Sequence, residues 1–330
     1  MRRTGRVPNA VPCAADVTGK CYPNKMPHRA PGSPKKGKGY LSGKPIRYYR
    51  PKGAAAIRTL IDDGFQAFNA ARLGEACRIF ADKMLAPTHD TTIALTIAGA
   101  LTPAGLGGCV IALMDRGLVD VIISTGANLY HDLHYALNFT LRRGSPFVDD
   151  RRLYEEGIIR IYDVLFPAQV LLDTDRFIRE FLASSGLDRP ISTADLHYEL
   201  GRHLLKVRPG CEQYSVVARA AKCGVPIYTS SPGDSSIGMN IAYHELINGS
   251  GLLLNPNKDV NEVCAIILAA EKNGCVILGG GSPKNLCTSR ACTMMPSGTC
   301  ARGSAALGVV EALTGCSDLS RPSRSVSPAA

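Results

Sequence analysis

The amino-acid sequence predicts an α/β fold in which a parallel sheet carries helices on both of its faces. Three observations lead to this prediction. Short apolar segments without alternating polar residues, such as residues 119–124, are typical of strands buried on both sides. These segments alternate along the chain with longer ones whose apolar residues recur at helical spacing. Several of the apolar segments end in loops of small residues, where ligands bind in open sheets of this kind.

The first part of the chain supplies helical segments and two strands in turn. Apolar residues recur at helical spacing over residues 57–85. Residues 91–97 have a strand-like pattern, and a loop rich in Gly and Pro follows over residues 98–108. A helix to about Arg116 then leads to the second predicted strand, residues 119–124.

The rest of the chain continues this alternation. A turn at residues 125–128 opens a helix that holds His131, Asp132 and His134. The further predicted elements are helices over residues 168–184, 193–206, 211–223 and 261–273 and strands over residues 225–230 and 275–278. The last of these strands ends in three successive glycines, so that the pattern of strand followed by small-residue loop recurs to the end of the sheet.

Composition excludes several classes of protein. At 45% hydrophobic and 20% charged residues, the 330-residue chain can bury a core and is not disordered overall. No uninterrupted apolar stretch approaches the roughly 20 residues of a membrane-spanning helix, so an integral membrane protein is excluded. Twelve cysteines are too few for a disulfide scaffold, and the N-terminus lacks the apolar region of a signal peptide. We therefore expect a cytoplasmic protein with cysteines that are mostly thiols.

The net charge of +10 is concentrated at the N-terminus, where residues 1–52 hold thirteen Lys and Arg and one acid. We expect three regions: a basic flexible tail over residues 1–40, a domain over residues 41–285, and an aberrant, disordered segment over residues 286–330 that is rich in Ser and Cys. For the tail, a solvated segment or sequence upstream of a start at Met26 is favoured over a nucleic-acid contact, because Tyr22 and Tyr40 are the only aromatic residues among its bases.

The loops that end the strands predict a nucleotide site. Carboxyl ends of parallel strands meet at one edge of a sheet, glycine there allows close approach to the backbone, and the next helix N-terminus favours phosphate. The site is Rossmann-like, although the chain has no G-x-G-x-x-G sequence. The loops in question are Ala98-Gly99-Ala100, Thr125-Gly126-Ala127, Pro232-Gly233-Asp234 and Gly279-Gly280-Gly281.

Six further segments stand out as motifs: 64–69 (GFQAFN), 99–105 (GALTPAG), 119–132 (VDVIISTGANLYHD), 157–167 (GIIRIYDVLFP), 232–240 (PGDSSIGMN) and 279–285 (GGGSPKN). Taken together, these segments resemble deoxyhypusine synthase, in particular its bacterial homologues. The resemblance covers roughly residues 40–285, with the motifs in the family's order and spacing.

This resemblance implies a Rossmann-like, NAD-binding fold and a homotetramer. It also implies an NAD-dependent transferase that oxidises spermidine and passes its aminobutyl group, through an imine on an enzyme lysine, to a lysine of the hypusine-containing translation factor. A small amine as acceptor would make the protein similar to homospermidine synthase instead. The chemistry is consistent with the cofactor carrying out hydride transfer and a lysine acting as nucleophile.

Carried over by resemblance, the site has a cofactor part and a substrate part. His131 and Met239 stand where eukaryotic members have acidic residues. The cofactor-binding residues implied are Gly99, Ala100, Leu101, Thr125, Gly126, Ala127, Asp234, Gly279, Gly280 and Gly281. The substrate-binding residues implied are His131, Asp132, Lys284 and Asn285.

The catalytic residue is not identified. The family's nucleophile lies in a Glu-Ala-Val-Ser-Trp-Gly-Lys stretch, whereas Lys284 is the last lysine of this chain and tryptophan is absent throughout. We expect a reading-frame shift or a truncated gene after Asn285. The alternative to an enzyme is therefore an inactive remnant, or a partner subunit that retains an NAD pocket.

Simpler roles compete with some of these assignments. Asp234 precedes two serines and has the position of a helix N-cap, and Lys284 could be a solvated lysine at a helix start. The three glycines from Gly279 could form only a tight turn. We expect no metal site, because His131 and His134 have no evident third ligand and the C-terminal cysteines lack paired C-x-x-C spacing.

Overall fold

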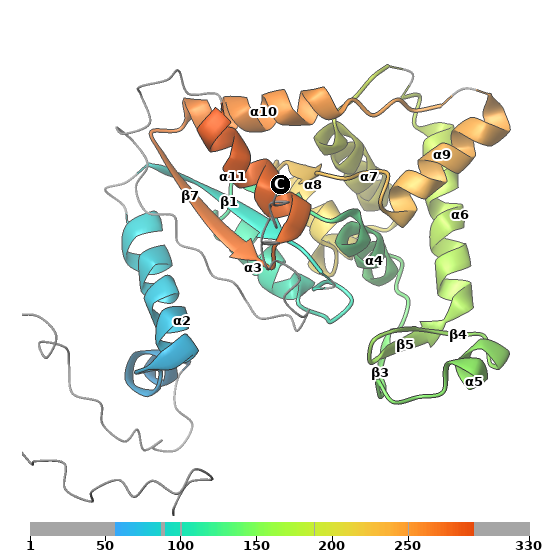
Figure 1. Ribbon diagram of the computed structural model, residues 1–330. Coiled ribbons are helices and arrows are strands. Elements are labelled where there is room, and N and C mark those ends of the chain that lie inside the picture. Colours follow the sequence, from blue (N-terminus) through green and yellow to red (C-terminus); the bar gives the residue numbers. More distant parts are fainter. Residues whose placement is uncertain (1–56, 87–89, 100, 188, 250, 294–330) are drawn as a thin grey trace, which may run out of the picture. The chain divides into compact units, whose positions relative to one another are not determined.

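A computed structural model describes residues 57–86, 90–99, 101–187, 189–249 and 251–293 (Figure 1). Four parallel strands form its main sheet: β1 (Thr91–Ile97), β2 (Val121–Ser124), β6 (Ile227–Thr229) and β7 (Lys272–Leu278). They lie in the order β6-β2-β1-β7. Each matches a predicted strand, and β1 has the predicted limits. The predicted parallel sheet is therefore confirmed.

Helices cover both faces of this sheet, because successive strand residues point to opposite sides. On β2, Ile122 packs with helices α3 (Gly107–Asp115), α4 (Gly126–Ala136) and α8 (Val216–Cys223) in the larger core cluster. Its neighbours Val121 and Ile123 belong to a second cluster on the other face, with residues of α10 (Pro256–Ala269) and α11 (Gly281–Thr293). The uninterrupted apolar strands thus reflect burial on both sides.

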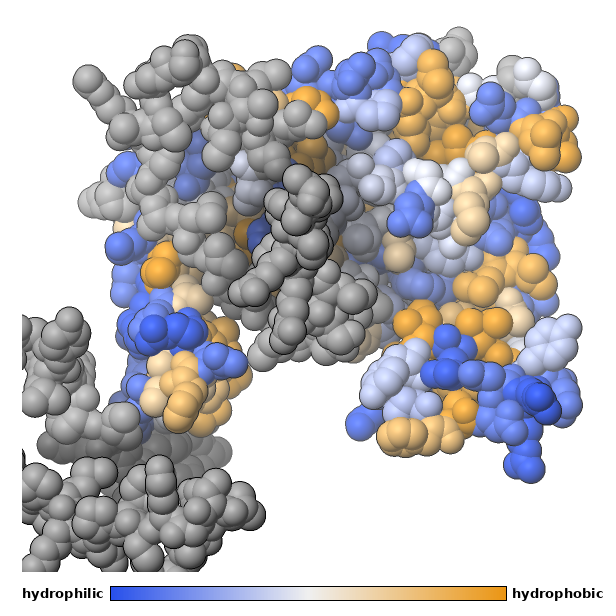
Figure 2. Space-filling model, viewed as in Figure 1, coloured by the Kyte–Doolittle hydropathy of each residue, from blue (hydrophilic) through white to orange (hydrophobic). Residues whose placement is uncertain are grey.

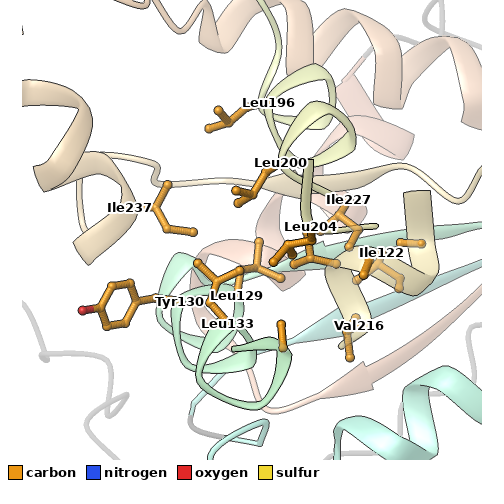
Figure 3. Close-up of a cluster of buried hydrophobic side chains, with 14 of the residues drawn as sticks. Ile122, Leu129, Tyr130, Leu133, Leu196, Leu200, Leu204, Val216, Ile227 and Ile237 are labelled. Carbon is orange, nitrogen blue, oxygen red and sulfur yellow. The ribbon is translucent and has the colours of Figure 1, made fainter. Parts of the chain in front are cut away.

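Helices α6 (Ala168–Ser184) and α7 (Thr193–Val207) match their predictions closely. Helix α7 begins at a capping box, in which the Ser192 side chain accepts from the Asp195 N–H and the Asp195 carboxylate accepts from the Ser192 N–H. Its residues Leu196, Leu200 and Leu204 form one buried stripe that packs on α4 and the sheet (Figure 3).

The predicted helix over residues 211–223 is wrong as a single element. A short 3-10 turn, Cys211–Gln213, is followed by a break, and α8 begins at Val216. The Ser215 hydroxyl accepts from the Ala218 N–H at 3.1 Å and so caps α8 at a new N-terminus. The N-cap serine, which interrupts the apolar periodicity, is the reason for the break.

The limits of α10 also differ from the prediction of residues 261–273. The helix starts at Pro256, after Asn255 caps the Asn257 N–H at 3.0 Å, and it ends at Ala269. Pro at the first helical position is well tolerated because its missing N–H would have no partner there. Residues 272 and 273 instead pair with Thr91 and Thr92 as the start of β7.

Helix α9 (Ser236–Asn248) follows β6 and is the helix that the predicted cap position of Asp234 implies. It exposes apolar side chains that include Leu246 and Ile247, in the region where Figure 2 shows orange surface. Other elements have no counterpart among the predictions. A small antiparallel sheet has the order β3-β5-β4 and accompanies α5 (Asp150–Glu155). Its strands are β3 (Arg142–Arg143), β4 (Ile158–Ile161) and β5 (Val164–Pro167).

The two ends of the described chain differ in detail from expectation. Residues 57–85 are not one helix: α1 (Ile57–Thr59) continues into a π-helical turn, and α2 (Phe68–Ile79) starts after a break. At the other end, α11 crosses position 285, and Leu286 lies in the second core cluster. The tail over residues 1–40 and the segment 294–330 lie outside the described residues. No helix of the described ranges is long and apolar enough to cross a membrane.

Candidate functional site

The carboxyl ends of the four parallel strands bring the predicted loops to one edge of the main sheet. The Ala98 N–H donates to the Leu278 carbonyl at 2.9 Å, and the Thr125 N–H donates to the Ile97 carbonyl at 3.1 Å. A Cβ added to Gly279 would lie 3.0 Å from the Cβ of Ala98. The segments that follow β1, β2 and β7 are therefore direct neighbours, as the sequence predicts.

Three glycines at this edge leave their backbone open. Gly99 and Gly281 both have φ near +68°, a conformation that L residues with side chains rarely adopt. Gly280 is the middle residue of the turn Gly279–Gly281. A Cβ added to any of the three would meet no atom within 4 Å. The missing side chains thus give a ligand direct access to the main chain, which is the role of glycine in phosphate-binding turns.

Gly126 has a different reason to be glycine. A Cβ at this position would overlap the side chain of Ser235, because the first turn of α4 packs directly on the start of α9. Ser235 is the N-cap of α9: its hydroxyl accepts from the Gly238 N–H at 3.1 Å and donates to the Pro232 carbonyl at 2.9 Å. Asp234 is exposed and makes no capping bond, so the proposed cap role of Asp234 is wrong.

The N-terminus of α4 faces the same edge without a side-chain cap. The side chain of Thr125, its N-cap residue, accepts no hydrogen bond from a backbone N–H of the first turn. Its hydroxyl instead accepts from the Asn128 side chain, Nδ2, at 2.9 Å. Asn128 is fully buried and accepts from the Thr102 N–H at 3.1 Å. Asn128 therefore holds the loop after β1 against α4, while the first amides of α4 have no side-chain acceptor among the described residues.

These observations fit a ligand that carries phosphate. Uncapped amides at a helix N-terminus and the helix dipole together favour an anion, and the open glycines allow it to approach closely. The buried hydroxyl of Thr229, at the end of β6, also has no hydrogen-bond partner within the described part of the chain. The residues present at this edge therefore suit the pyrophosphate of a dinucleotide.

Asp132 occupies a place that sequence reasoning did not anticipate. Its carboxylate is 1% exposed and accepts three hydrogen bonds, from the Ser215 hydroxyl at 2.6 Å and from the N–H groups of Val216 and Val217 at 2.8 and 3.0 Å. Burial raises the pKa of Asp132 to about 6, and these hydrogen bonds oppose that rise. The structure gives Asp132 the role of joining α4 to the start of α8.

His131 lies beside a buried aromatic group. The ring centroids of His131 and His134 are 5.0 Å apart, and the His134 ring is 5.5 Å from Phe166. Neither nitrogen of His134 has a partner among the described residues. Burial lowers the pKa of His131 to about 4 and that of His134 to about 3. Both rings are thus neutral at pH 7, so neither adds a positive charge that would repel a cationic amine.

Lys284 and Asn285 lie on the first turns of α11, next to Gly281 in sequence. Lys284 is half-buried and Asn285 is exposed. Asn285 lines a pocket of about 410 Å³ at the ends of β6 and β7. The other residues around this pocket are Ser230, Pro232, Pro256, Asn257, Asp259, Val260, Ser282 and Leu286.

Hydrogen bonds hold two separate parts of the wall of this pocket. The Ser230 hydroxyl donates to the Ser282 hydroxyl at 2.8 Å, which joins the end of β6 to the start of α11. Asp259 is 4% exposed and accepts from both the N–H and the hydroxyl of Thr193 at 2.7 and 2.9 Å. Burial raises the pKa of Asp259 to about 6. Ser282 directly follows Gly281, so the pocket adjoins the glycine loop.

The remaining predicted residues have mixed positions. Leu101 packs against the larger core cluster, whereas Ala127 and Met239 are exposed at the starts of α4 and α9. Ala100 lies outside the described residues. Within the described ranges, no group of three or more His, Cys, Asp or Glu side chains could hold a metal ion.

Sequence reasoning missed two residues that shape this edge, Asn128 and Ser235. Both act through contacts with distant segments, Asn128 on Thr102 and Ser235 on Gly126. Serine is a preferred N-cap residue, so Ser235 directly before a helix start is a signal that would have identified the cap. No local pattern marks Asn128.

Comparison with known proteins identifies relatives of the chain. A sequence model described as deoxyhypusine synthase matches residues 62–310. A deoxyhypusine synthase-like protein from Cyanothece sp. is 50% identical over 242 residues, which cover 70% of this chain and 60% of that protein. A protein from Methanosarcina mazei described as deoxyhypusine synthase 2 is 34% identical over 218 residues, which cover 66% of this chain and 61% of that protein.

A solved structure shares the fold. The crystal structure from Entamoeba histolytica, described as that of a deoxyhypusine synthase, has a TM-score of 0.55 at 17% identity and covers 72% of this chain and 79% of its own. The chain spans about 60% of the length of the two curated relatives named above. The family model covers most of the chain and the sequence identity extends across the same region, so the chain belongs to the deoxyhypusine synthase family.

Proposed function

We propose that the chain binds NAD at the carboxyl edge of its main sheet. The observation that carries this proposal is the convergence of open glycines at the ends of β1 and β7 with the uncapped N-terminus of α4. The backbone of Gly99, Gly280 and Gly281 would approach the pyrophosphate, and the first amides of α4 would donate to it. Membership of the deoxyhypusine synthase family supports the same cofactor.

The chain's own residues would position the cofactor. Asn128 would hold the loop after β1 in place, and the Gly126–Ser235 contact would fix the distance between the starts of α4 and α9. When bound, NAD would accept a hydride from the carbon next to an amine nitrogen. The neutral His131 ring would face a polyamine as a hydrogen-bond acceptor without charge repulsion.

As the activity of the whole protein we propose aminobutyl transfer from spermidine to an acceptor amine. The acceptor is either a protein lysine or, as in a homospermidine synthase-like enzyme, a small amine. The second candidate function is an NAD-binding partner subunit without its own nucleophile. We further propose a homo-oligomer, the tetramer that the family implies, because α9 exposes Leu246 and Ile247 to solvent.

NAD binding is tested by calorimetric titration of the full chain with two matched variants. Gly281→Ala and Gly186→Ala both place a Cβ at positive φ, +68° and +61°, and in both cases the Cβ meets open space. Only Gly281 lies at the strand ends. We expect the Gly281→Ala variant to bind NAD at least about tenfold more weakly, while Gly186→Ala binds as the parent does.

Absence of NAD binding by the parent chain, or equal weakening by both variants, would contradict the cofactor site. Incubation with NAD and spermidine, followed by borohydride reduction and mass spectrometry, then separates the two functions. A reduced aminobutyl adduct on a lysine identifies the transferase. NAD binding without NADH formation or adduct identifies the partner subunit.

A further inference from the structure

Two cysteines meet in the core beside the glycine loop, outside the residues considered above. Cys275 is the fourth residue of β7, and Cys287 lies on α11. Their sulfur atoms are 3.3 Å apart and share a hydrogen bond, and both residues are free thiols. The side chains are 4% and 8% exposed, within the cluster that fills the second face of the sheet. The segment between them contains the whole Gly279–Gly281 turn.

The spacing of the two sulfurs suits bond formation. A disulfide needs a sulfur–sulfur distance of about 2 Å, so the sulfurs must approach each other by little more than an ångström. Cys264 on α10 is equally buried, but it has no such thiol partner among the described residues. The proximity of Cys275 and Cys287 is therefore a property of this pair and does not follow from burial alone.

The hydrogen bond between the thiols divides their roles. It lowers the pKa of Cys287, because the Cys275 thiol can donate to the Cys287 thiolate, and the same bond together with burial raises the pKa of Cys275. The thiolate is the reactive form of cysteine, so Cys287 is the first of the two to react. Cys275 is then in position to displace whatever group Cys287 has taken up.

We propose that Cys275 and Cys287 are a redox modification site that forms a reversible disulfide between β7 and α11. The oxidant is a small disulfide such as oxidised glutathione. The Cys287 thiolate attacks one sulfur of the oxidant. This forms a mixed disulfide between Cys287 and one glutathione and releases the other glutathione as a thiolate. Cys275 then attacks Cys287 Sγ while its thiol proton passes to the departing sulfur, and the second glutathione is released as a thiol. Two protein thiols are oxidised, and one glutathione disulfide is reduced to two thiols.

The bond would close a ring around the glycine turn. In the reduced protein, α11 is held to the sheet by packing and by single hydrogen bonds such as the one between Ser230 and Ser282. A covalent link restricts the unfolded chain and fixes α11 against β7. We therefore expect oxidation to raise the melting temperature of the full chain by a few degrees and to slow amide hydrogen exchange along α11.

Peptide mapping of the parent chain tests the proposal without any substitution. The full chain is incubated in a glutathione redox buffer, free thiols are blocked at low pH, and the protein is cut with trypsin without reduction. Cleavage after Lys272, Lys284 and Arg290 places Cys275 in the peptide 273–284 and Cys287 in the peptide 285–290, with no other cysteine in either. We expect a linked pair that is two hydrogens lighter than the sum of its parts and that disappears on treatment with dithiothreitol.

Two control variants sharpen this test. Cys264→Ala removes an equally buried thiol and should leave the linked pair unchanged, whereas Cys287→Ala should abolish both the link and the rise in melting temperature. The exposed Cys109 and Cys223 report that the oxidant has acted, since they take up glutathione. Recovery of Cys275 and Cys287 as blocked free thiols, or as stable mixed disulfides with glutathione, under these conditions would overturn the proposal.

Discussion

Replacing Asp132 with alanine removes the acceptor that joins α4 to α8. Three donors then lose their partner: the Ser215 hydroxyl and the N–H groups of Val216 and Val217, which bond to the carboxylate at 2.6, 2.8 and 3.0 Å. A buried donor left without a partner costs about 1–3 kcal/mol. The hydroxyl can turn to another acceptor, but the two amides of the helix N-terminus are fixed. We therefore expect a loss of about 3–5 kcal/mol in the free energy of unfolding.

This loss is large compared with the total stability of a typical domain, about 5–15 kcal/mol. For a domain of this size it corresponds to a fall in melting temperature of about 6–20 °C. The assay is urea unfolding followed by circular dichroism, together with calorimetry of the full chain. Asp62→Ala is the control, because Asp62 is a half-exposed partner of Arg58, and it should change stability by no more than about 0.5 kcal/mol.

A second variant shows that the effect acts through α8. Ser215→Ala removes one of the three donors and also the cap of α8, and should cost about 1–2 kcal/mol. The double variant should lose less than the sum of the two single losses, because both remove the same hydrogen bond. An Asp132→Ala protein with the stability of the parent would refute this reasoning and return Asp132 to the substrate site that the sequence predicts.

Two further predictions concern α4. Gly126→Ala should destabilise the chain by about 1–3 kcal/mol and weaken NAD binding, because the new Cβ overlaps the side chain of Ser235. The double variant with Ser235→Gly should recover most of the stability in urea unfolding, since Gly replaces a capping residue at little cost. Failure of this rescue would show that the contact with Ser235 is not the cause. His134→Leu tests the buried imidazole, whose folded-state pKa of about 3 lies below its unfolded value of 6.5. The neutral ring therefore stabilises the fold above pH 6.5, and this contribution is lost as the pH falls toward 3. Between pH 6.5 and pH 5, the free energy of unfolding of the parent should fall by about 2 kcal/mol through His134 alone. If the parent and the leucine variant lost equal stability over this range, the low pKa of His134 would be contradicted.

Local patterns predicted the main sheet well because a strand buried on both sides is apolar along its whole length. β1 has its predicted limits, and the loops after β1, β2 and β7 meet where the topology of a parallel sheet requires. Patterns failed where polar capping decides an element: Ser215 divides the helix predicted over residues 211–223, and Asn255 starts α10 before its apolar stripe begins. The short strands β3, β4 and β5 are too brief to produce a readable periodicity.

The candidate site shows the same division. Sequence resemblance grouped His131 with Asp132, although the two side chains have different surroundings. His131 lies beside the rings of Tyr130 and His134, and the Asp132 carboxylate is buried under α8. Adjacent residues of a helix point in directions about 100° apart, so neighbours in sequence do not share a site by default.

The sequence by itself determined the parallel α/β architecture, the glycine turns at the strand ends and the family motifs, because apolar periodicity and the conformational freedom of glycine are local properties. Tertiary structure alone decided which distant groups meet: Asp132 with the start of α8, Gly126 with Ser235, and Cys275 with Cys287. These pairings depend on how helices pack across the sheet, and that packing is set by the summed contacts of the whole core. A polar or reactive side chain therefore acquires its role from the partner that the fold brings to it.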